Sequence, residues 1–376
     1  MSFSDDSADT DGAAAAAGGP TGDRSPRERE GATRWAGGRR LTGVLGWAST
    51  PICVATAVLF LVSWILEPSS VRGSALLGML PFAGLLAIAA MGQTLVIQQG
   101  GIDLSVAGML SMTVVIMTLY PNGDSSKLPV AVLLAFAVTL AAGLFTGIVV
   151  SRIGVTPIVA TLGMNALLYG GVIELSHGFL PTTTSGLFNF ASGRFLGVPN
   201  TIIVAVVLTA AVGFGIKRTV FGRRFEAVGA GLFGARAAGL GTWRYQLGAY
   251  VAAAALYCTA GILLAGVVST PSVFQGDSYL LPSVAAVVLG GTSLLGGRGS
   301  VAATAIAALF ITQLGQFVLE TGAAQAVQNL VNAGALAVGL AIYSVPWRRL
   351  TTAIRGRSGN DLPGMPENPS MGMRAA

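Results

Sequence analysis

Long apolar stretches separated by short polar turns make up most of the chain, from about residue 41 to residue 345. They lack the alternation typical of strands, and most reach the ~20 residues that a helix needs to cross a bilayer. In lipid, only helices and closed barrels satisfy their own backbone, so the pattern predicts about ten membrane-spanning helices. The expected segments are 41–66, 74–98, 102–119, 128–150, 156–175, 199–217, 245–269, 281–296, 299–319 and 325–345.

Two places depart from simple crossings. Only residues 99–101 separate the second and third segments, and the eighth, 281–296, is short for a span. Broken or re-entrant segments are tolerated where they line protein or a cavity. The predicted fold is therefore an all-α membrane protein with about ten transmembrane helices, or eight crossings plus two re-entrant pieces.

Glycine pairs mark both departures. Gly100 and Gly101 open the string Gly-Gly-Ile-Asp-Leu-Ser, and Gly296 and Gly297 stand before Arg298 in Gly-Gly-Arg-Gly-Ser. Each pair follows one apolar run and opens another, as expected of corresponding turns in two repeated halves of five helices each. Chance similarity in a chain with 52 glycines is the competing explanation.

Composition agrees with burial in lipid, since 53% of residues are hydrophobic and 10% are charged, against about 25% in soluble domains. Residues 1–40 are polar, with arginines concentrated toward the first span, and are predicted to form a disordered cytoplasmic tail, followed by a transmembrane domain over 41–345 and a cytoplasmic tail over 346–376. With alternating spans, all basic residues except Arg72, Lys127 and Arg194 fall on one side, so both termini are expected in the cytoplasm. A single histidine argues against a metal site that needs several.

Asp103 is the one acidic residue inside the first four predicted spans. A charge at mid-membrane costs ~2.5–3.5 kcal/mol, but after a glycine pair at a helix start it can cap free N–H groups. A place in the substrate path and proton coupling are the alternatives.

Amide side chains also lie inside the spans. They donate and accept hydrogen bonds, which suits an uncharged polyhydroxy solute, although hydrogen bonds between helices would explain them equally well. The candidate residues for a substrate path are Gln93, Asp103, Asn165, Gln313, Gln316, Gln328, Asn329 and Asn332.

The loop over residues 222–244 is too polar to span. Phe225, Val228 and Leu232 recur at helical spacing among charged residues, which predicts a short amphipathic helix, either on the membrane surface or docked to a cytoplasmic partner. Its candidate coupling residues are Arg224, Glu226, Gly229, Arg236 and Gly239.

Four stretches together resemble the permease family of bacterial ABC importers for ribose, xylose and related sugars. They are the Gly-Gly-Ile-Asp-Leu-Ser string at 100–105, the Pro-Ile-Val-Ala-Thr-Leu-Gly string at 157–163, the loop at 222–244, and the glycine-rich run at 290–300. The resemblance covers about residues 41–345. Two departures stand out: residues 229–233 read Gly-Ala-Gly-Leu-Phe where the family usually has Gly-Gly-Asn and acidic residues, and Tyr169 replaces a usual arginine.

The resemblance implies a permease in the bacterial plasma membrane that is not an enzyme and holds no cofactor. Its implied partners are a cytoplasmic ATP-binding subunit seated against residues 226–240, an extracytoplasmic solute-binding protein, a second permease subunit and membrane lipid, but no nucleic acid. The lysine positions also indicate that the ATPase lies on a separate chain. A P-loop needs Gly-Lys followed by Ser or Thr, whereas Lys127 and Lys217 are followed by Leu128 and Arg218.

Other classes stay open at this point. A secondary transporter would use Asp103 to bind a coupling ion, and a passive facilitator would need no energy; neither needs the 222–244 loop. Within the importers, the solute could be a sugar, nucleoside, polyol, signalling sugar or branched amino acid. The outer loop, about 174–200, is either a receiving surface for a binding protein or a cover.

Overall fold

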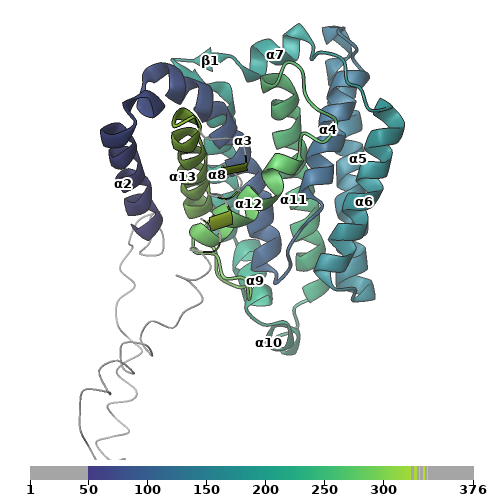
Figure 1. Cartoon of the computed structure of the whole chain (residues 1–376). Helices are drawn as coiled ribbons and strands as arrows, with labels where there is room; N and C mark the ends of the chain where they lie inside the picture. The colour runs from purple at the N-terminus through teal and green to yellow at the C-terminus, as the bar shows by residue number, and fades with distance from the viewer. Residues whose placement is uncertain (1–49, 323–325, 328–329, 331–332, 335–336, 338–376) are drawn as a thin grey trace, which may run out of the picture. The chain divides into compact units, whose positions relative to one another are not determined.

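The computed structural model describes residues 50–322, 326–327, 330, 333–334 and 337 (Figure 1). In this part the chain forms twelve α-helices and one two-stranded hairpin. The helices are α2 (Thr50–Leu66), α3 (Gly73–Gln98), α4 (Val106–Leu119), α5 (Leu128–Ile148), α6 (Pro157–Ser176), α7 (Ser185–Ala191), α8 (Asn200–Arg218), α9 (Val220–Ala230), α10 (Leu232–Ala237), α11 (Thr242–Val267), α12 (Asp277–Leu289) and α13 (Val301–Glu320).

Length and composition make six of the described helical segments able to cross a membrane. They are Gly73–Gln98, Ser125–Ile153, Pro157–Ser176, Asn200–Arg218, Thr242–Val267 and Val301–Glu320. The apolar helices α2, α4 and α12 are shorter. The all-α membrane fold is therefore confirmed, while the two repeated halves stay a prediction. The predicted tails, 1–40 and 346–376, and most of the predicted segment 325–345 lie outside the described residues.

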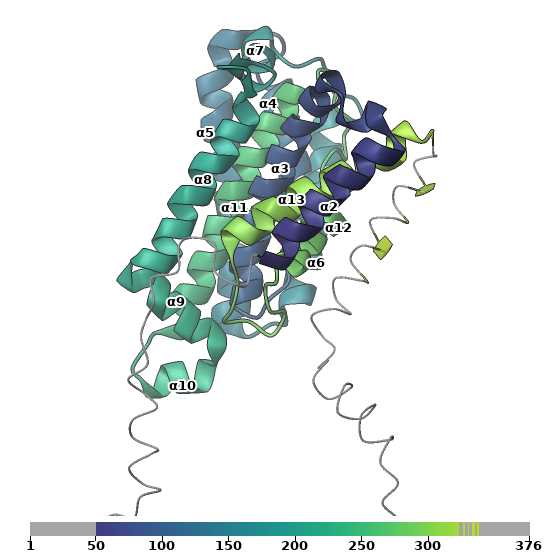
Figure 2. The ribbon, with the colours of Figure 1, turned by 90° about the vertical axis from the view of Figure 1, so that its left-hand side faces the viewer.

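Helices α3 and α11 lie in the interior of the bundle (Figures 1 and 2). In their most apolar windows 61% and 67% of the residues are buried, against 22% for α6 and 17% for α8, whose apolar surfaces are left to face lipid. Small residues allow close contacts around α11: a Cβ added to Gly143 would lie 2.5 Å from Ala254 Cβ, and one added to Gly261 would lie 2.6 Å from Thr113 Cβ. Small residues at helix contacts are typical of membrane bundles.

Two predicted boundaries were wrong where the chain turns at glycines. Helix α4 begins at Val106 rather than 102, because residues 99–105 form an irregular turn. Helix α12 covers Asp277–Leu289 instead of 281–296, because the chain leaves the helix at Gly290 and then takes positive φ at Gly291, +78°. Apolar periodicity extends through both turns and therefore hides them.

The outer loop contains secondary structure that the sequence did not predict. It contains α7 and a hairpin of β1 (Arg194–Phe195) and β2 (Val198–Pro199). Thr184 caps α7 by accepting a hydrogen bond of 3.4 Å from the Leu187 N–H, and α7 packs so closely on α11 that a Cβ on Gly266 would lie 2.5 Å from Ala191 Cβ. The loop is thus fastened to the central helix at this end of the bundle (Figure 1).

Candidate functional site

Three segments that are distant in sequence meet at the end of α3. The Gly297 N–H donates a hydrogen bond of 2.9 Å to the carbonyl oxygen of Gln98, the last residue of α3. Beside them, Gly229 comes from the end of α9 and Gly296 from the turn between α12 and α13. We call these four residues the glycine junction. It brings both predicted glycine turns and the loop at 222–244 to one place.

The contacts of the glycine junction are made by backbone atoms. A Cβ added to Gly229 would lie 1.9 Å from the Gln98 carbonyl oxygen, and one added to Gly296 would lie 2.7 Å from the Gly229 carbonyl oxygen. Gly296 and Gly297 also have positive φ, +90° and +76°, which side chains other than hydrogen disfavour. No larger residue fits these positions unless the backbone moves.

The predicted amphipathic helix is two helices, α9 and α10, separated by Gly231. We call α9 and α10 together the amphipathic segment. In α9, Phe225 and Val228 are buried, while Arg223 and Arg224 are exposed. The segment is fastened to the bundle because the side-chain amide of Gln99 donates a hydrogen bond of 2.9 Å to the Phe225 carbonyl.

Charged residues and turns shape the rest of this region. The Lys217 ammonium lies 2.6 Å from Glu226 Oε1, so the two charges are paired at the start of the amphipathic segment. Arg236 is exposed, and its Nε donates a hydrogen bond of 3.2 Å to the Thr242 hydroxyl. Gly239 takes a φ of +77° after α10, which lets the chain turn into α11.

Asp103 is fully buried in the turn before α4. Its Oδ1 accepts hydrogen bonds from the Ser105 N–H (2.9 Å) and hydroxyl (2.5 Å), and it is Ser105 that precedes the helix. Its Oδ2 has no hydrogen-bond partner among the described residues. Asp103 therefore closes a local turn and leaves one carboxylate oxygen available.

Gln93 supports the same turn from α3. With its amide oriented so that both polar atoms are satisfied, Gln93 accepts from the Asp103 N–H (3.2 Å) and donates to the Asp103 carbonyl (3.0 Å) and the Tyr257 hydroxyl (2.9 Å). The side chain is fully buried. These contacts make Gln93 a brace between α3, the turn and α11.

The remaining predicted path residues are dispersed. Asn165 Oδ1 accepts a hydrogen bond of 2.8 Å from the Gly108 N–H and so joins α6 to α4. Gln313 is buried and its amide atoms find no partner among the described residues, whereas Gln316 donates to Glu320 at 2.8 Å along α13. The structure does not place these side chains in one cavity. The candidates Gln328, Asn329 and Asn332 lie outside the described residues.

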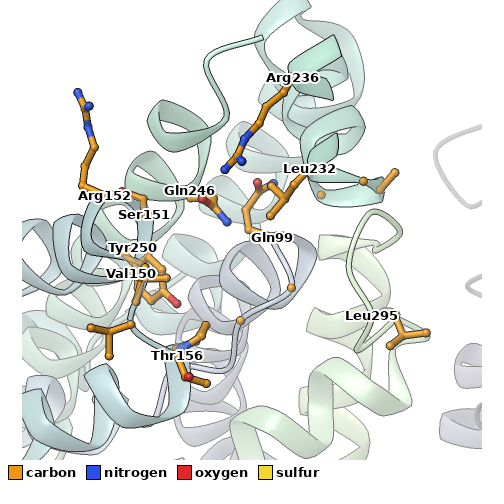
Figure 3. A pocket seen from close by; sticks show the side chains of 18 residues that line it. Gln99, Val150, Ser151, Arg152, Thr156, Leu232, Arg236, Gln246, Tyr250 and Leu295 are labelled. Atoms are coloured by element: carbon orange, nitrogen blue, oxygen red, sulfur yellow. The ribbon is translucent and has the colours of Figure 1, made fainter. Parts of the chain in front are cut away.

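A pocket of 630 Å³ opens beside the amphipathic segment, between α10, α11 and the turn after α5 (Figure 3). Residues that sequence reasoning did not select line it, among them Gln99, Ser151, Gln246 and Tyr250. The signal was present in α11, where Gln246 and Tyr250 are polar residues four apart in an apolar helix and so share a face. None of the predicted path residues that the structure describes lines this pocket, although the predicted coupling residues Gly229 and Arg236 do.

Arginine and tryptophan stack near this pocket. The guanidinium of Arg152, in the π-helical turn Val149–Ile153 after α5, lies 3.6 Å from the ring centroid of Trp243 at the start of α11. The guanidinium of Arg244 lies 5.5 Å from the same centroid. Such cation–π contacts stabilise by roughly 0.5–1 kcal/mol at exposed sites. The Arg152 contact joins the end of α5 to α11 next to the amphipathic segment, whereas Arg244 and Trp243 both belong to α11.

The architecture and this site define a class of protein. A bundle of membrane-crossing helices has irregular turns at its interior, and a basic amphipathic segment touches those turns directly. No cluster of three or more His, Cys, Asp or Glu suited to a metal ion occurs in the described part. The chain is a multi-pass inner membrane protein and a non-catalytic component of a transporter.

The family follows from comparison with known proteins. Residues 75–344 match the model of the branched-chain amino acid transport system permease component, and the chain belongs to this family of ABC importer permeases for sugars and branched-chain amino acids. The family implies an ABC ATPase and a solute-binding protein as partners. No solved structure matches the chain.

Three relatives share similar identity with this chain. The ribose import permease protein RbsC of Escherichia coli K12 is 32% identical over 285 residues, which cover 74% of this chain and 88% of RbsC. The autoinducer 2 import system permease protein LsrC of Escherichia coli K12 / DH10B is 32% identical over 69% of this chain and 76% of its own length. The fructose import permease protein FruF of Bifidobacterium longum is 32% identical over 69% and 74%.

Proposed function

We propose that this chain is the membrane-spanning permease of an ATP-driven importer that moves a sugar or related polyhydroxy solute, delivered by an extracytoplasmic binding protein. Two copies of the chain form the passage, and both termini lie in the cytoplasm. The observation that carries the proposal is the glycine junction. There a basic, exposed amphipathic segment contacts the irregular turns of two membrane helices with no side chain between them.

The glycine junction supplies a route for mechanical work. ATP-driven closure of the partner ATPase displaces the amphipathic segment. Because Gly229 lies directly on Gln98, that displacement moves the end of α3, and the Gln98–Gly297 hydrogen bond carries it to the turn before α13. The irregular turns permit such movement because they are not held in continuous helical hydrogen bonding. The helices then rock between outward-facing and inward-facing states, and no bond in the solute is broken.

The polyhydroxy class of solute is supported by two observations. The three relatives described above are named for import of ribose, autoinducer 2 and fructose. The interior of this chain also holds uncharged amides, including Gln313, whose buried amide atoms find no partner within the described residues. Amides match hydroxyl groups by donating and accepting together.

Co-purification tests the importer. The full chain, purified from its native host in mild detergent, is expected to recover a P-loop ATPase detectable by mass spectrometry. Charge reversal at Arg223 and Arg224, which are exposed on the amphipathic segment, should release it. Charge reversal at Arg194, in the hairpin β1–β2, is the matched control and should retain the ATPase. Recovery of the chain alone, with gradient-driven uptake in liposomes, would overturn the importer.

One observation favours a second candidate, an ion-coupled transporter. The buried Asp103 has an oxygen with no partner in the described structure, as a cation ligand would have before the ion binds. This candidate requires transport by the chain without an ATPase and a strict need for the Asp103 charge.

A further inference from the structure

The pocket beside the amphipathic segment has unusual polar chemistry. Three of its lining residues carry a buried polar atom with no hydrogen-bond partner in the described structure, namely Gln99 Oε1, Ser151 Oγ and the Tyr250 hydroxyl. Gln99 is 7% exposed and Tyr250 is 2% exposed. A buried polar group without a partner destabilises the folded protein, so three such groups around one pocket need an explanation. A polar ligand that bonds them would supply it.

The charge of the pocket is positive. Its lining contains Arg152 and Arg236 and no acidic residue. Arg152 points away from the pocket in Figure 3 and stacks on Trp243. Arg236 points inward toward Gln246 and Gln99, and its Nε is held by Thr242. Its terminal amino groups form no ion pair in the part of the chain that is described, and a guanidinium of this kind suits a phosphate or carboxylate.

The number of donors favours phosphate. On the Arg236 side of the pocket lie the Gln246 amide and the Ser151 hydroxyl, whereas Thr156 lies at the opposite end (Figure 3). Together with the terminal amino groups of Arg236, these two groups offer more donors than the two oxygens of a planar carboxylate require. The Tyr250 hydroxyl and the Gln99 carbonyl then remain for hydroxyl groups of the ligand. The volume of 630 Å³ lies within the ~300–1,000 Å³ of typical small-molecule sites.

We propose that this pocket binds a small polyhydroxy compound that carries a phosphate group. The ligand contacts α10 through Arg236, α11 through Gln246 and Tyr250, and the turn after α5 through Ser151. It thereby restrains the amphipathic segment relative to the membrane helices. Because the proposed import requires the amphipathic segment to move, the bound ligand slows import. This consequence rests on the proposed function, whereas binding of the ligand does not. The ligand belongs to the class that a kinase produces from a sugar after entry.

Equilibrium dialysis with the full chain in phosphatidylcholine nanodiscs tests the site, with labelled ribose 5-phosphate and ribose as probes. We expect saturable binding of ribose 5-phosphate, at least ~10-fold tighter than that of ribose because of the charged hydrogen bonds to Arg236. Arg236→Gln should weaken it about 10-fold or more. Arg223→Gln, an exposed arginine of α9 outside the pocket, is the matched control and should change it less than about 2-fold.

Tyr250→Phe separates ligand binding from folding. The Tyr250 hydroxyl has no partner in the described structure, so its removal should leave thermal stability unchanged or raised, yet weaken ribose 5-phosphate binding about 3- to 10-fold. Unchanged binding in Tyr250→Phe, equal binding in Arg236→Gln and Arg223→Gln, or no saturable binding would each overturn the site.

A lipid headgroup with a glycerol phosphate has the same chemistry as the soluble ligand. Nanodiscs containing phosphatidylglycerol distinguish the two sources: binding of ribose 5-phosphate that persists there identifies a soluble ligand, and binding that is lost through competition identifies the headgroup. Recovery of the ATPase is measured separately. The two proposals can therefore be rejected separately. Loss of the importer proposal leaves Arg236-dependent binding untouched, and absence of that binding leaves the importer proposal untouched.

Discussion

The backbone N–H of Gly297 donates a 2.9 Å hydrogen bond to the carbonyl oxygen of Gln98. The last carbonyls of a helix have no partner inside that helix and must be satisfied elsewhere. Here the partner comes from a turn 199 positions later in the chain, and Gly229 of the amphipathic segment lies against the same carbonyl. One oxygen atom thus joins two membrane helices to the segment that faces the proposed ATPase.

Gly229→Ala should damage transport at this contact. The added methyl would lie 1.9 Å from the Gln98 carbonyl, so backbone must move at a cost of about 1–3 kcal/mol. We expect uptake to fall about 10-fold or more relative to ATP hydrolysis, because the amphipathic segment no longer seats on α3. The measurement is ATP-driven uptake with parallel ATPase rates in proteoliposomes containing the full complex.

Gly234→Ala is the matched control for that variant. Gly234 lies in α10 of the same segment and has nothing within 4 Å of the added methyl. Alanine also favours a helix over glycine by about 1 kcal/mol, so stability and uptake should be retained or slightly raised. Equal effects of the two substitutions would argue against the glycine junction as the point of transmission.

Gln93→Leu should destabilise the protein. Leucine keeps the size of the side chain but leaves the backbone of Asp103 and the Tyr257 hydroxyl without partners in a buried place, which costs about 1–3 kcal/mol. Thermal unfolding in detergent should show a lower midpoint. Gln316→Leu, which removes only a bond to the exposed Glu320, should shift it far less. A midpoint unchanged by Gln93→Leu would show that Gln93 does not brace the turn.

Asp103→Asn distinguishes the two proposed energy sources. Asparagine keeps a side-chain oxygen for the Ser105 N–H, so the turn should persist with a loss of about 1 kcal/mol or less. An importer should then retain ATP-dependent uptake within about 3-fold of the parent chain. Loss of gradient-dependent uptake in liposomes that hold this chain alone would instead support ion coupling. The assay is paired uptake with and without ATP and with and without an ion gradient.

Labelling of single cysteines should reveal the orientation in the membrane. The side chains of Phe233 in α10 and Leu196 in the hairpin are both 89% exposed. With both termini in the cytoplasm, Phe233→Cys should react with an impermeant maleimide only in inverted vesicles and Leu196→Cys only in intact cells. Cys53 and Cys258 are replaced by serine in both variants. The reverse pattern would contradict the proposed topology.

The hydrogen-bond partners of the interior amides cannot be predicted from the pattern of residues. The sequence predicts Gln93, Asn165 and Gln316 as path residues because a polar group in an apolar span is costly without a partner. The reason in the structure is a turn brace for Gln93, a bond between helices for Asn165 and a bond along one helix for Gln316. The pattern identifies that such a group is unusual, but its partner depends on how the helices are rotated and stacked.

The same limit applied to the loop at 222–244. Its charged and apolar positions predicted helix and an exposed face, and both are present. The division at Gly231 was missed because the apolar spacing of Phe225, Val228 and Leu232 runs across it.

The pattern of apolar and charged residues is enough to predict the membrane class, the helical content and the approximate limits of most spans, because the hydrophobic effect and the need to satisfy the backbone in lipid act on local composition. Two other features come from tertiary packing: the meeting of Gln98, Gly229 and Gly297, and the pocket that Arg236 shares with two residues of α11, Gln246 and Tyr250. Contacts between distant segments depend on how closely whole helices pack. The distance between two helices depends on the small residues of both facing surfaces. It therefore cannot be predicted from either helix alone.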